Sequence, residues 1–313
     1  MAFYIKSKLK TTYCLLIGLS LCMLILCGCE KKQEPYVSAS TTIRDNTPNC
    51  LVPSADGTVT YENDYVSVDA SHTQEGYLMV FYKGSCEKVK LQITGPDYMT
   101  YTYDLNTSGY EVFPLSAGDG TYQVGIHENV EGSQYATIFS EELAVQISNL
   151  MGPFLYPNQY VKFSSDSNVV AKGAELVAPA HDDLEAINYV YNYMIENITY
   201  DYNKAQTVQS GYVPDPDEIL SIKTGICLDY AAVMASMLRS QNIPTRLEVG
   251  YAGDAYHAWI STYVENQGWI NGIIQFDGQN WSIMDPTFAA NAGEKELKNF
   301  IGDGSNYVTK YVY

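Results

Sequence analysis

The chain has 313 residues, 46% of them hydrophobic and 17% charged, which is the composition of an ordinary soluble globular protein long enough for two domains. Its formal net charge is −18 at pH 7, and no stretch of it gathers Lys and Arg into a basic stripe. Because such a surface repels phosphate backbones, the composition excludes nucleic acid as a partner.

Residues 1–28 predict a secretory signal peptide. Three lysines precede an uncharged apolar run from Tyr13 to Cys27, which is too short for a stable transmembrane helix. The Leu-Cys-Gly-Cys stretch at residues 26–29 resembles the cleavage box of bacterial lipoproteins. That resemblance implies that Cys29 becomes a lipidated N-terminus, which would anchor the protein at the extracellular face of the bacterial cell membrane. An ordinary signal peptide that is cleaved nearby is the alternative.

Residues 29–49 predict a flexible tether. The segment is rich in Ser, Thr, Lys, Glu and Asn and has few apolar side chains to bury, so it lacks the means to form a core. A tether of this kind would place the folded part of the protein beyond the membrane.

The cysteine count is compatible with an exported protein. Of the seven cysteines, three lie in the signal peptide and Cys29 is the lipidation candidate, which leaves Cys50, Cys86 and Cys227. A disulfide between Cys50 and Cys86 would stabilise the first domain by about 2–4 kcal/mol, but their spacing does not decide whether it forms. Cys227 is the thiol left over, and an odd thiol in a secreted chain is a candidate for reactivity.

Residues 50–150 predict a β-sandwich of immunoglobulin-like type. Short stretches rich in β-branched and aromatic residues alternate with clusters of Gly, Pro, Asp and Asn, and no long helical pattern interrupts them. The many tyrosines would also suit carbohydrate binding, although tyrosine in an alternating strand more often packs against a neighbouring strand. The predicted strands are residues 77–82, 89–93, 99–103, 120–126 and 143–147.

Residues 151–313 predict a second domain, of α+β type. Its first part, residues 151–178, is expected to join the domains and to pack against the second one. Asp182 or Asp183 is suited to cap a helix that ends near residue 197, because an apolar stripe follows at three-and-four spacing. Residues 204–217 form a polar loop with two prolines, which we expect to border a substrate groove.

Residues 224–239 place a cysteine where a loop turns into an apolar helix. Gly225 allows a tight turn, and the residues from Ala231 to Leu238 are mostly good helix formers with apolar side chains at three-and-four spacing. We therefore expect a buried helix that starts near Cys227. The N–H groups and partial positive charge of a helix N-terminus stabilise a thiolate and can hold an oxyanion. A lone cysteine at such a place is more often a packing residue, so its chemistry depends on a nearby base.

A base and a carboxylate follow Cys227 in chain order. His257 lies in a stretch, residues 256–264, that alternates large apolar and polar side chains and therefore predicts a strand. Asp285 ends a second short predicted strand that begins at Trp281, and Pro286 stops it. Cys, His and Asp can supply a nucleophile, the base that activates it and the group that fixes the tautomer of the base.

Further motifs surround these residues in a fixed order. They are Gly225-x-Cys227 followed by Asp229-Tyr230-Ala231, then Leu238-Arg239, Ile243-Pro244-Thr245-Arg246, Val249-Gly250-Tyr251, His257-Ala258-Trp259 and Asp285-Pro286-Thr287. Together they resemble the transglutaminase-like superfamily, which is related to papain-type thiol enzymes, and the resemblance covers about residues 180–290. Papain itself fits less well, because its third catalytic residue is usually Asn.

The resemblance implies a papain-like fold and a role for each of four residues. Cys227 would be the nucleophile, His257 the general base and acid, and Asp285 the group that orients the imidazole. Tyr200 is a candidate for a second oxyanion donor beside the N–H of Cys227, and a plain packing role for Tyr200 is the alternative.

The remaining ionisable groups suggest no metal and no other cofactor. His72, His127 and His181 lack metal-ligand spacing with one another, and no stretch has the run of acidic residues that a calcium loop needs. Asp229 points away from Cys227 on a helix, so a local hydrogen bond is expected of it rather than a role as base. Arg239 and Arg246 are expected to pair with core carbonyls or carboxylates.

The resemblance thus implies a thiol enzyme that acts on protein or peptide amides through a thioester. Hydrolysis, glutamine deamidation and cross-linking to a lysine amine use the same three residues, and analogy slightly favours a protease or amidase. One alternative is a non-catalytic surface lipoprotein that binds a wall polymer or a protein partner, although such a scaffold has no need of all three residues. Another is an acetyl-transferring thiol enzyme with a small thioester donor, which fits poorly with an extracellular location.

Overall fold

The computed structural model describes residues 44–106, 108–271, 273–276, 281–284 and 307–313. They lie within Ile43–Tyr313, one of the two units into which the chain divides. The predicted signal peptide, Cys29 and most of the predicted tether lie outside the described residues. Among the helices within the described ranges, none is long and apolar enough to cross a membrane.

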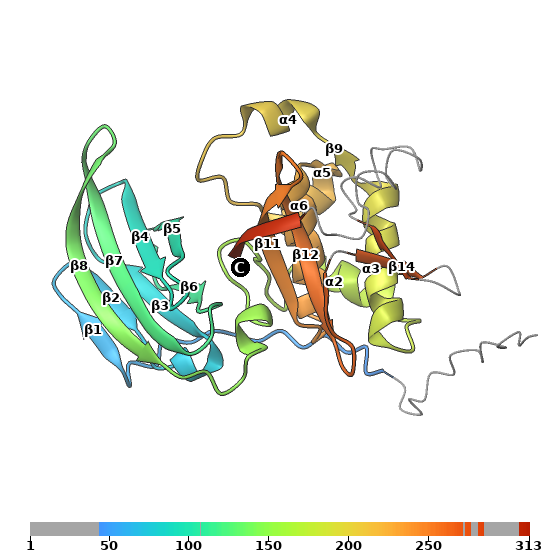
Figure 1. Cartoon of the computed structure of the whole chain (residues 1–313), viewed down its shortest axis with the longest axis horizontal. Helices are drawn as coiled ribbons and strands as arrows, with labels where there is room; N and C mark the ends of the chain where they lie inside the picture. Colours follow the sequence, from blue (N-terminus) through green and yellow to red (C-terminus); the bar gives the residue numbers. More distant parts are fainter. Residues whose placement is uncertain (1–43, 107, 272, 277–280, 285–306) are drawn as a thin grey trace, which may run out of the picture. The chain divides into compact units, whose positions relative to one another are not determined.

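Two four-stranded antiparallel sheets form the N-terminal part of this unit (Figure 1). One sheet has the order β1-β2-β3-β6 and the other the order β5-β4-β7-β8. Their bounds are β1 (Thr60–Glu62), β2 (Val66–Asp69), β3 (Tyr77–Tyr82), β4 (Val89–Thr94), β5 (Thr100–Asp104), β6 (Glu111–Pro114), β7 (Gly120–Glu131) and β8 (Gln134–Val145), with a short helix η1 (Thr73–Glu75) between β2 and β3.

Alternating side chains create the face on which these sheets pack. In β4, Val89, Leu91 and Ile93 are buried while the residues between them are half-buried, as expected for a strand with one face towards the core. The ring of Tyr103 in β5 contacts that of Phe113 in β6 at 4.8 Å between centroids, which joins the two sheets. The five predicted strands coincide with β3, β4, β5, β7 and the end of β8, whereas β1, β2 and β6 were not foreseen. The immunoglobulin-like type of this β-domain stays a prediction.

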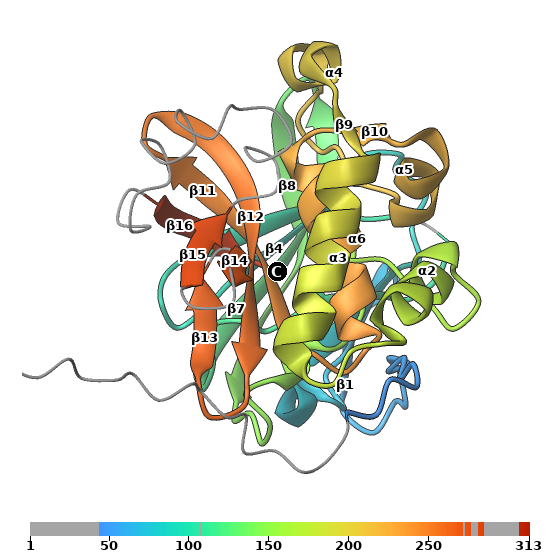
Figure 2. The ribbon, with the colours of Figure 1, turned by 90° about the vertical axis from the view of Figure 1, so that its right-hand side faces the viewer.

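The C-terminal part combines helices with an antiparallel sheet of order β13-β12-β11-β16 (Figure 2), so the predicted α+β class is confirmed. The elements are η2 (Gly152–Phe154), α2 (Asn168–Val177), α3 (Asp183–Asn197), β9 (Thr199–Tyr200), α4 (Tyr202–Thr207), α5 (Pro216–Ile222), β10 (Thr224–Gly225), α6 (Cys227–Arg239), β11 (Thr245–Ala252), β12 (Ala255–Val264), β13 (Gly268–Asn271), β14 (Ile273–Phe276), β15 (Trp281–Met284) and β16 (Tyr307–Val312).

Helix α6 is the centre of this part. Every residue from Asp229 to Arg239 is buried, and α2, α3 and α5 pack around the helix while β11 and β12 cover it from the sheet. The helix expected near Cys227 is therefore present and buried. Gly173 of α2 allows a close helix crossing, because a Cβ there would lie 3.2 Å from the Cβ of Met237.

Several local predictions can be compared directly with the structure. The side chain of Asp182 accepts a hydrogen bond from the N–H of Glu185 at 2.9 Å, so Asp182 is the cap of α3. The segment expected to join the domains and to pack against the second one contains α2, which packs on α3 and α6. The predicted polar loop at residues 204–217 contains the end of α4 and the start of α5.

Cys50 and Cys86 are free thiols, so the disulfide left open by their spacing is not formed in the structure. Hydrogen bonds that hold the two cysteines at different parts of the protein explain why they do not pair. The N–H of Asn49 donates to the carbonyl of Ser240, directly after α6, which holds the neighbouring Cys50 at the C-terminal part. The thiol of Cys86 instead donates to the carbonyl of Lys88 in the β-domain, at 3.4 Å.

The last residues of the predicted tether are bound rather than free. Arg44 forms an ion pair with Asp183 at 2.8 Å, and Asn46 donates from its side chain to the carbonyl of Ala180 at 2.9 Å. Contact with the folded unit thus begins before residue 50, because these polar side chains find acceptors on the helical part.

Arg239 ties three distant segments together at the end of α6. Its guanidinium is fully buried and donates to the carbonyls of Thr245, Tyr156 and Tyr313 at 2.9, 2.6 and 2.7 Å. Burial lowers the pKa of Arg239 to about 9, which still leaves the group charged at neutral pH. The expectation that Arg239 pairs with core carbonyls is confirmed.

Replacing this side chain should destabilise the whole C-terminal part. We expect Arg239→Met to lower the free energy of unfolding by about 3–5 kcal/mol, because three buried carbonyls would lose their donor. Urea unfolding followed by tryptophan fluorescence measures the change. Lys88→Met, at an exposed position, is the control and should change the free energy by less than about 0.5 kcal/mol. Equal unfolding midpoints for the two variants would contradict the role given to Arg239.

Candidate active site

Cys227 is the first residue of α6 and is half-buried. Ile226 before it is extended, with φ −98° and ψ 177°, and the N–H of Tyr230 donates the first helical hydrogen bond to the carbonyl of Ile226 at 3.1 Å. The N–H groups in the first turn of a helix have no acceptor within the helix and carry partial positive charge. These N–H groups are suited to donate to an oxyanion formed beside the thiol.

Asp229 fixes the start of this helix. Its carboxylate accepts the N–H of Ile226 at 2.8 Å, which bends the chain back over the first turn. It also accepts from the ammonium of Lys204 and from the hydroxyl of Tyr212, both at 2.6 Å, and it is wholly buried. The predicted local hydrogen bond is confirmed. The contacts with Lys204 and Tyr212 were missed because no motif relates residues so far apart in the chain.

Tyr212 is held in its neutral form by this arrangement. Burial, and then the hydrogen bond to Asp229, raise the pKa of Tyr212 far above its ordinary value. The phenol is therefore a permanent donor to the carboxylate at neutral pH. The loop that carries Tyr212 is tied in this way to the residue that caps the helix of Cys227.

Gly225 leaves no room for a side chain at the turn before Cys227. A Cβ at this position would lie 2.6 Å from the Cβ of Asp229, a distance that real Cβ atoms do not show. Gly225 also pairs in parallel with Tyr200, and its carbonyl accepts the N–H of Asp201 at 2.9 Å. Tyr200, the candidate oxyanion donor, thus lies on the strand beside the helix start, where its ring contacts that of Tyr202 at 5.0 Å.

His257 lies in β12, which packs against α6. It is 5% exposed and pairs with Gly250 of β11. Its ring stacks on that of Trp259 at 6.2 Å, as expected for residues two apart on one face of a strand. The predicted strand around His257 is confirmed.

Tyr256 precedes His257 at the start of β12. Burial is the main cause that raises the pKa of Tyr256. Because β12 packs against α6, the structure brings the strand of His257 and the helix of Cys227 together, although the two are far apart in the sequence.

Asp285 lies outside the described residues. The predicted strand before it is present as β15, which pairs with β14, and β14 contacts β12. The position of Asp285 in the triad stays a prediction. Within the described ranges, no group of three or more His, Cys, Asp or Glu side chains could hold a metal ion.

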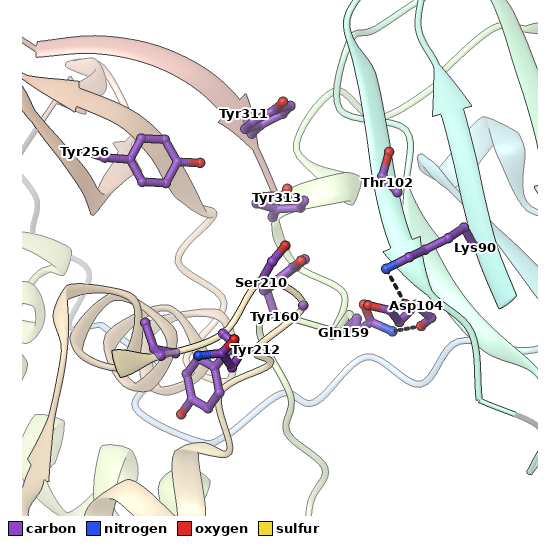
Figure 3. Close-up of a pocket in the computed structure, with 13 residues that line it drawn as sticks. Lys90, Thr102, Asp104, Gln159, Tyr160, Ser210, Tyr212, Tyr256, Tyr311 and Tyr313 are labelled. Carbon is purple, nitrogen blue, oxygen red and sulfur yellow. Dashed lines mark hydrogen bonds and ion pairs between the residues drawn. The ribbon is translucent and has the colours of Figure 1, made fainter. Parts of the chain in front are cut away.

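A pocket of about 340 Å³ opens beside Tyr256 (Figure 3). In the view of Figure 3, Tyr256 stands on one side of the pocket and Lys90 and Asp104 of the β-domain stand on the other. Residues 208–212 also line the pocket, and they belong to the loop that was expected to border a groove. The tyrosines that line it are Tyr160, Tyr212, Tyr256, Tyr311 and Tyr313.

Removing the cap carboxylate should disturb both the helix start and the loop. We expect Asp229→Ala to lower the free energy of unfolding by about 2–4 kcal/mol, because Lys204, Tyr212 and the N–H of Ile226 all lose their acceptor. Thermal unfolding measures the loss. The exposed Glu196→Gln is the control, and an Asp229→Ala protein as stable as this control would disprove the anchoring role.

Comparison with known proteins finds that this region is similar to one family. A model described as the transglutaminase-like superfamily matches residues 171–272. A UPF0252 protein of Methanocaldococcus jannaschii is 27% identical over 129 residues, which are 37% of this chain and 35% of that protein. A protein-glutamine gamma-glutamyltransferase of Pseudomonas aeruginosa is 28% identical over 109 residues, which are 29% of this chain and 14% of that protein. This chain therefore spans only a minor part of either relative.

Among solved structures, the periplasmic domain of TgpA from Pseudomonas aeruginosa, bound to ethylmercury, is similar over 77% of this chain and 78% of that chain. The sequence identity is 16% and the TM-score 0.34, so this likeness by itself carries no argument about chemistry.

Proposed function

We propose that the protein is a thiol enzyme that acts on protein and peptide amides through a thioester on Cys227, and the match of residues 171–272 to the transglutaminase-like superfamily supports this. The observation that carries this proposal is the position of Cys227 in the first turn of α6, the helix that packs against the strand bearing His257. A buried helix start concentrates N–H dipoles at the thiol, and an imidazole on the adjacent strand is suited to move its proton.

The proposed reaction has two halves. In the first, the sulfur of Cys227 attacks the amide carbon, and His257 takes the thiol proton. The C–N bond then breaks as His257 gives this proton to the leaving amine, which leaves an acyl thioester. In the second half, a water or an amine attacks the thioester carbon, loses a proton through His257, and Cys227 leaves as the thiol.

Three further groups would support these steps. Asp285 would accept a hydrogen bond from the imidazole and fix its tautomer. The N–H groups at the start of α6 would donate to the oxygen that gains charge during the attack. Tyr200, on the strand next to Gly225, would supply a second donor to this oxygen.

The acyl acceptor decides the biological outcome. Water gives peptide hydrolysis or glutamine deamidation, and a lysine amine gives a cross-link. We favour a protease or amidase by analogy with the family. The relative named as a protein-glutamine gamma-glutamyltransferase supports transfer instead, and it matches over only 14% of its own length.

We also propose that the protein is anchored by lipid on Cys29 at the outer face of the membrane. The support is the sequence at residues 26–29 and the apolar run before it.

Thiol reactivity tests the proposed nucleophile. In a protein that carries Cys50→Ala and Cys86→Ala, iodoacetamide should alkylate Cys227 rapidly at neutral pH, because His257 would take the thiol proton as general base. We expect His257→Ala to slow this alkylation by about tenfold or more, since this variant removes the base.

A second thiol in the same chain provides the reference. Burial raises the pKa of Cys50, so Cys50 in a Cys227→Ala protein should react slowly until the pH exceeds the ordinary thiol range. If Cys227 reacts no faster than Cys50 at neutral pH, the non-catalytic surface protein becomes the better interpretation.

Product analysis separates the outcomes of the acyl transfer. A glutamine-rich protein incubated with the enzyme, with and without a labelled primary amine, should show cleaved bonds or deamidated glutamines by mass spectrometry. Incorporation of the amine would show that cross-linking is the preferred outcome. Products that persist with Cys227→Ala would exclude Cys227 as the nucleophile.

Membrane anchoring has its own test. In a bacterial host that processes lipoproteins, the unaltered chain should incorporate labelled palmitate and sediment with the membranes. Cys29→Ser should abolish the labelling, because the thiol is the acylation site. Labelling that survives this substitution would contradict the proposed anchor.

A further inference from the structure

Strand β5 is an edge strand of the β-domain. Its sheet has the order β5-β4-β7-β8, so within the described residues β5 pairs with a strand on one side only. An open edge presents backbone N–H and C=O groups to whatever lies beside it. The surroundings of this edge therefore decide whether another strand can pair with it.

The register shows which residues of β5 face outward. Lys90 pairs with Asp104 and Gln92 pairs with Thr102. The N–H of Leu105 donates to the carbonyl of Val89 at 3.0 Å, so residues 105, 103 and 101 direct their backbone groups at β4. The backbone groups of residues 104, 102 and 100 consequently point away from β4.

A hydrogen bond of Asp104 confirms that its backbone groups point away from β4. Its carbonyl accepts a hydrogen bond from the side-chain amide of Gln159 at 2.7 Å, from the side opposite to β4. The amide of Gln159 thus occupies one position where a neighbouring strand would place its N–H. Thr102, the next outward residue along the edge, is exposed and lines the pocket.

The pocket also lies beside the start of α6. Tyr212 lines it, and the hydroxyl of Tyr212 donates to Asp229 at 2.6 Å, two residues after Cys227 in the same helix. Tyr256, which precedes His257 in β12, stands across the pocket from Lys90 (Figure 3). An outward-facing strand edge and the helix start that bears the thiol therefore border a single opening of about 340 Å³.

We propose that the β-domain is part of the substrate site and that an extended polypeptide pairs with the edge of β5 at Thr102 as an added strand. This inference rests on the proposed function, because the polypeptide that pairs with β5 also contains the amide that Cys227 attacks. The N–H and C=O of Thr102 bond to one substrate residue, and the chain continues past Tyr256 to Cys227.

The chemistry of the pocket favours a polypeptide backbone over a charged ligand. Its two charged side chains, Lys90 and Asp104, neutralise each other in an ion pair at 2.5 Å. The other walls are mainly tyrosine rings, which offer broad apolar contact and hydroxyl groups to many side chains. Such a site recognises main chain and tolerates varied side chains. The substrates are therefore unfolded or extended segments, since a folded protein has already paired its backbone.

Binding to a protein without its thiol tests this inference independently of catalysis. Full-length Cys227→Ala should bind fluorescein-labelled, reduced and carboxymethylated lysozyme more tightly than native lysozyme in fluorescence anisotropy. Adding Thr102→Pro removes the outward N–H and spares the bonds to β4, so we expect affinity to fall about tenfold. Adding Thr102→Val keeps the backbone and should change affinity by less than about twofold.

Peptide chemistry gives a second readout that needs no altered β5. In glutamine-containing peptides N-methylated at one amide after another, we expect binding losses at every second amide, which is the period of a paired strand. If the Thr102→Pro protein fails to fold, the period of these binding losses tests the strand pairing by itself. Losses without this period, or equal binding by Thr102→Pro and Thr102→Val proteins that are both folded, would overturn the inference.

The proposed function and this inference can fail separately. If Cys227 reacts rapidly and products form while the alternating pattern is absent, the thiol enzyme stands and the strand pairing is wrong. If the alternating pattern is present while Cys227 is unreactive, the site binds extended chains and the enzyme proposal is wrong.

Discussion

The buried carboxylate of Asp229 is the constraint on which the candidate site depends. It accepts the N–H of Ile226 and so fixes where α6 begins, which places Cys227 in the first turn. The same carboxylate holds Lys204 and Tyr212, and Tyr212 belongs to the loop that lines the pocket. One buried acceptor thus positions both the thiol and a wall of the opening that leads to it. A buried carboxylate is stable in this place because all of its partners are donors at 2.6–2.8 Å.

A second constraint lies at the other end of the same helix. Arg239 donates to three carbonyls, those of Tyr156 before α2, of Thr245 in β11 and of Tyr313 after β16. Because these carbonyls come from segments far apart in the chain, the C-terminal part closes around the guanidinium. The helix is thus fixed at its start by a carboxylate and at its end by a cation. These two anchors hold Cys227 in a fixed position relative to the sheet.

The β-domain makes direct contacts with the C-terminal part. Tyr101 of β5 contacts Tyr313 at 5.5 Å between ring centroids, and Ser116 donates to the carbonyl of Val312 at 2.7 Å. These contacts keep the edge of β5 beside the pocket. Most tyrosines of these strands are buried packing residues, as their alternation indicated, and carbohydrate binding finds no specific support in them.

The sequence by itself determined the local features of this protein. The apolar spacing after Gly225 predicted α6 and its start, the alternation around His257 predicted β12, and Asp182 or Asp183 marked the start of α3, because caps and periodicity depend on near neighbours. Only the tertiary structure decided that Cys50 and Cys86 stay free, that Asp229 holds Lys204 and Tyr212, and that β12 packs against α6. These are contacts between segments distant in the chain, and packing and hydrogen-bond geometry, rather than any local pattern, select such contacts.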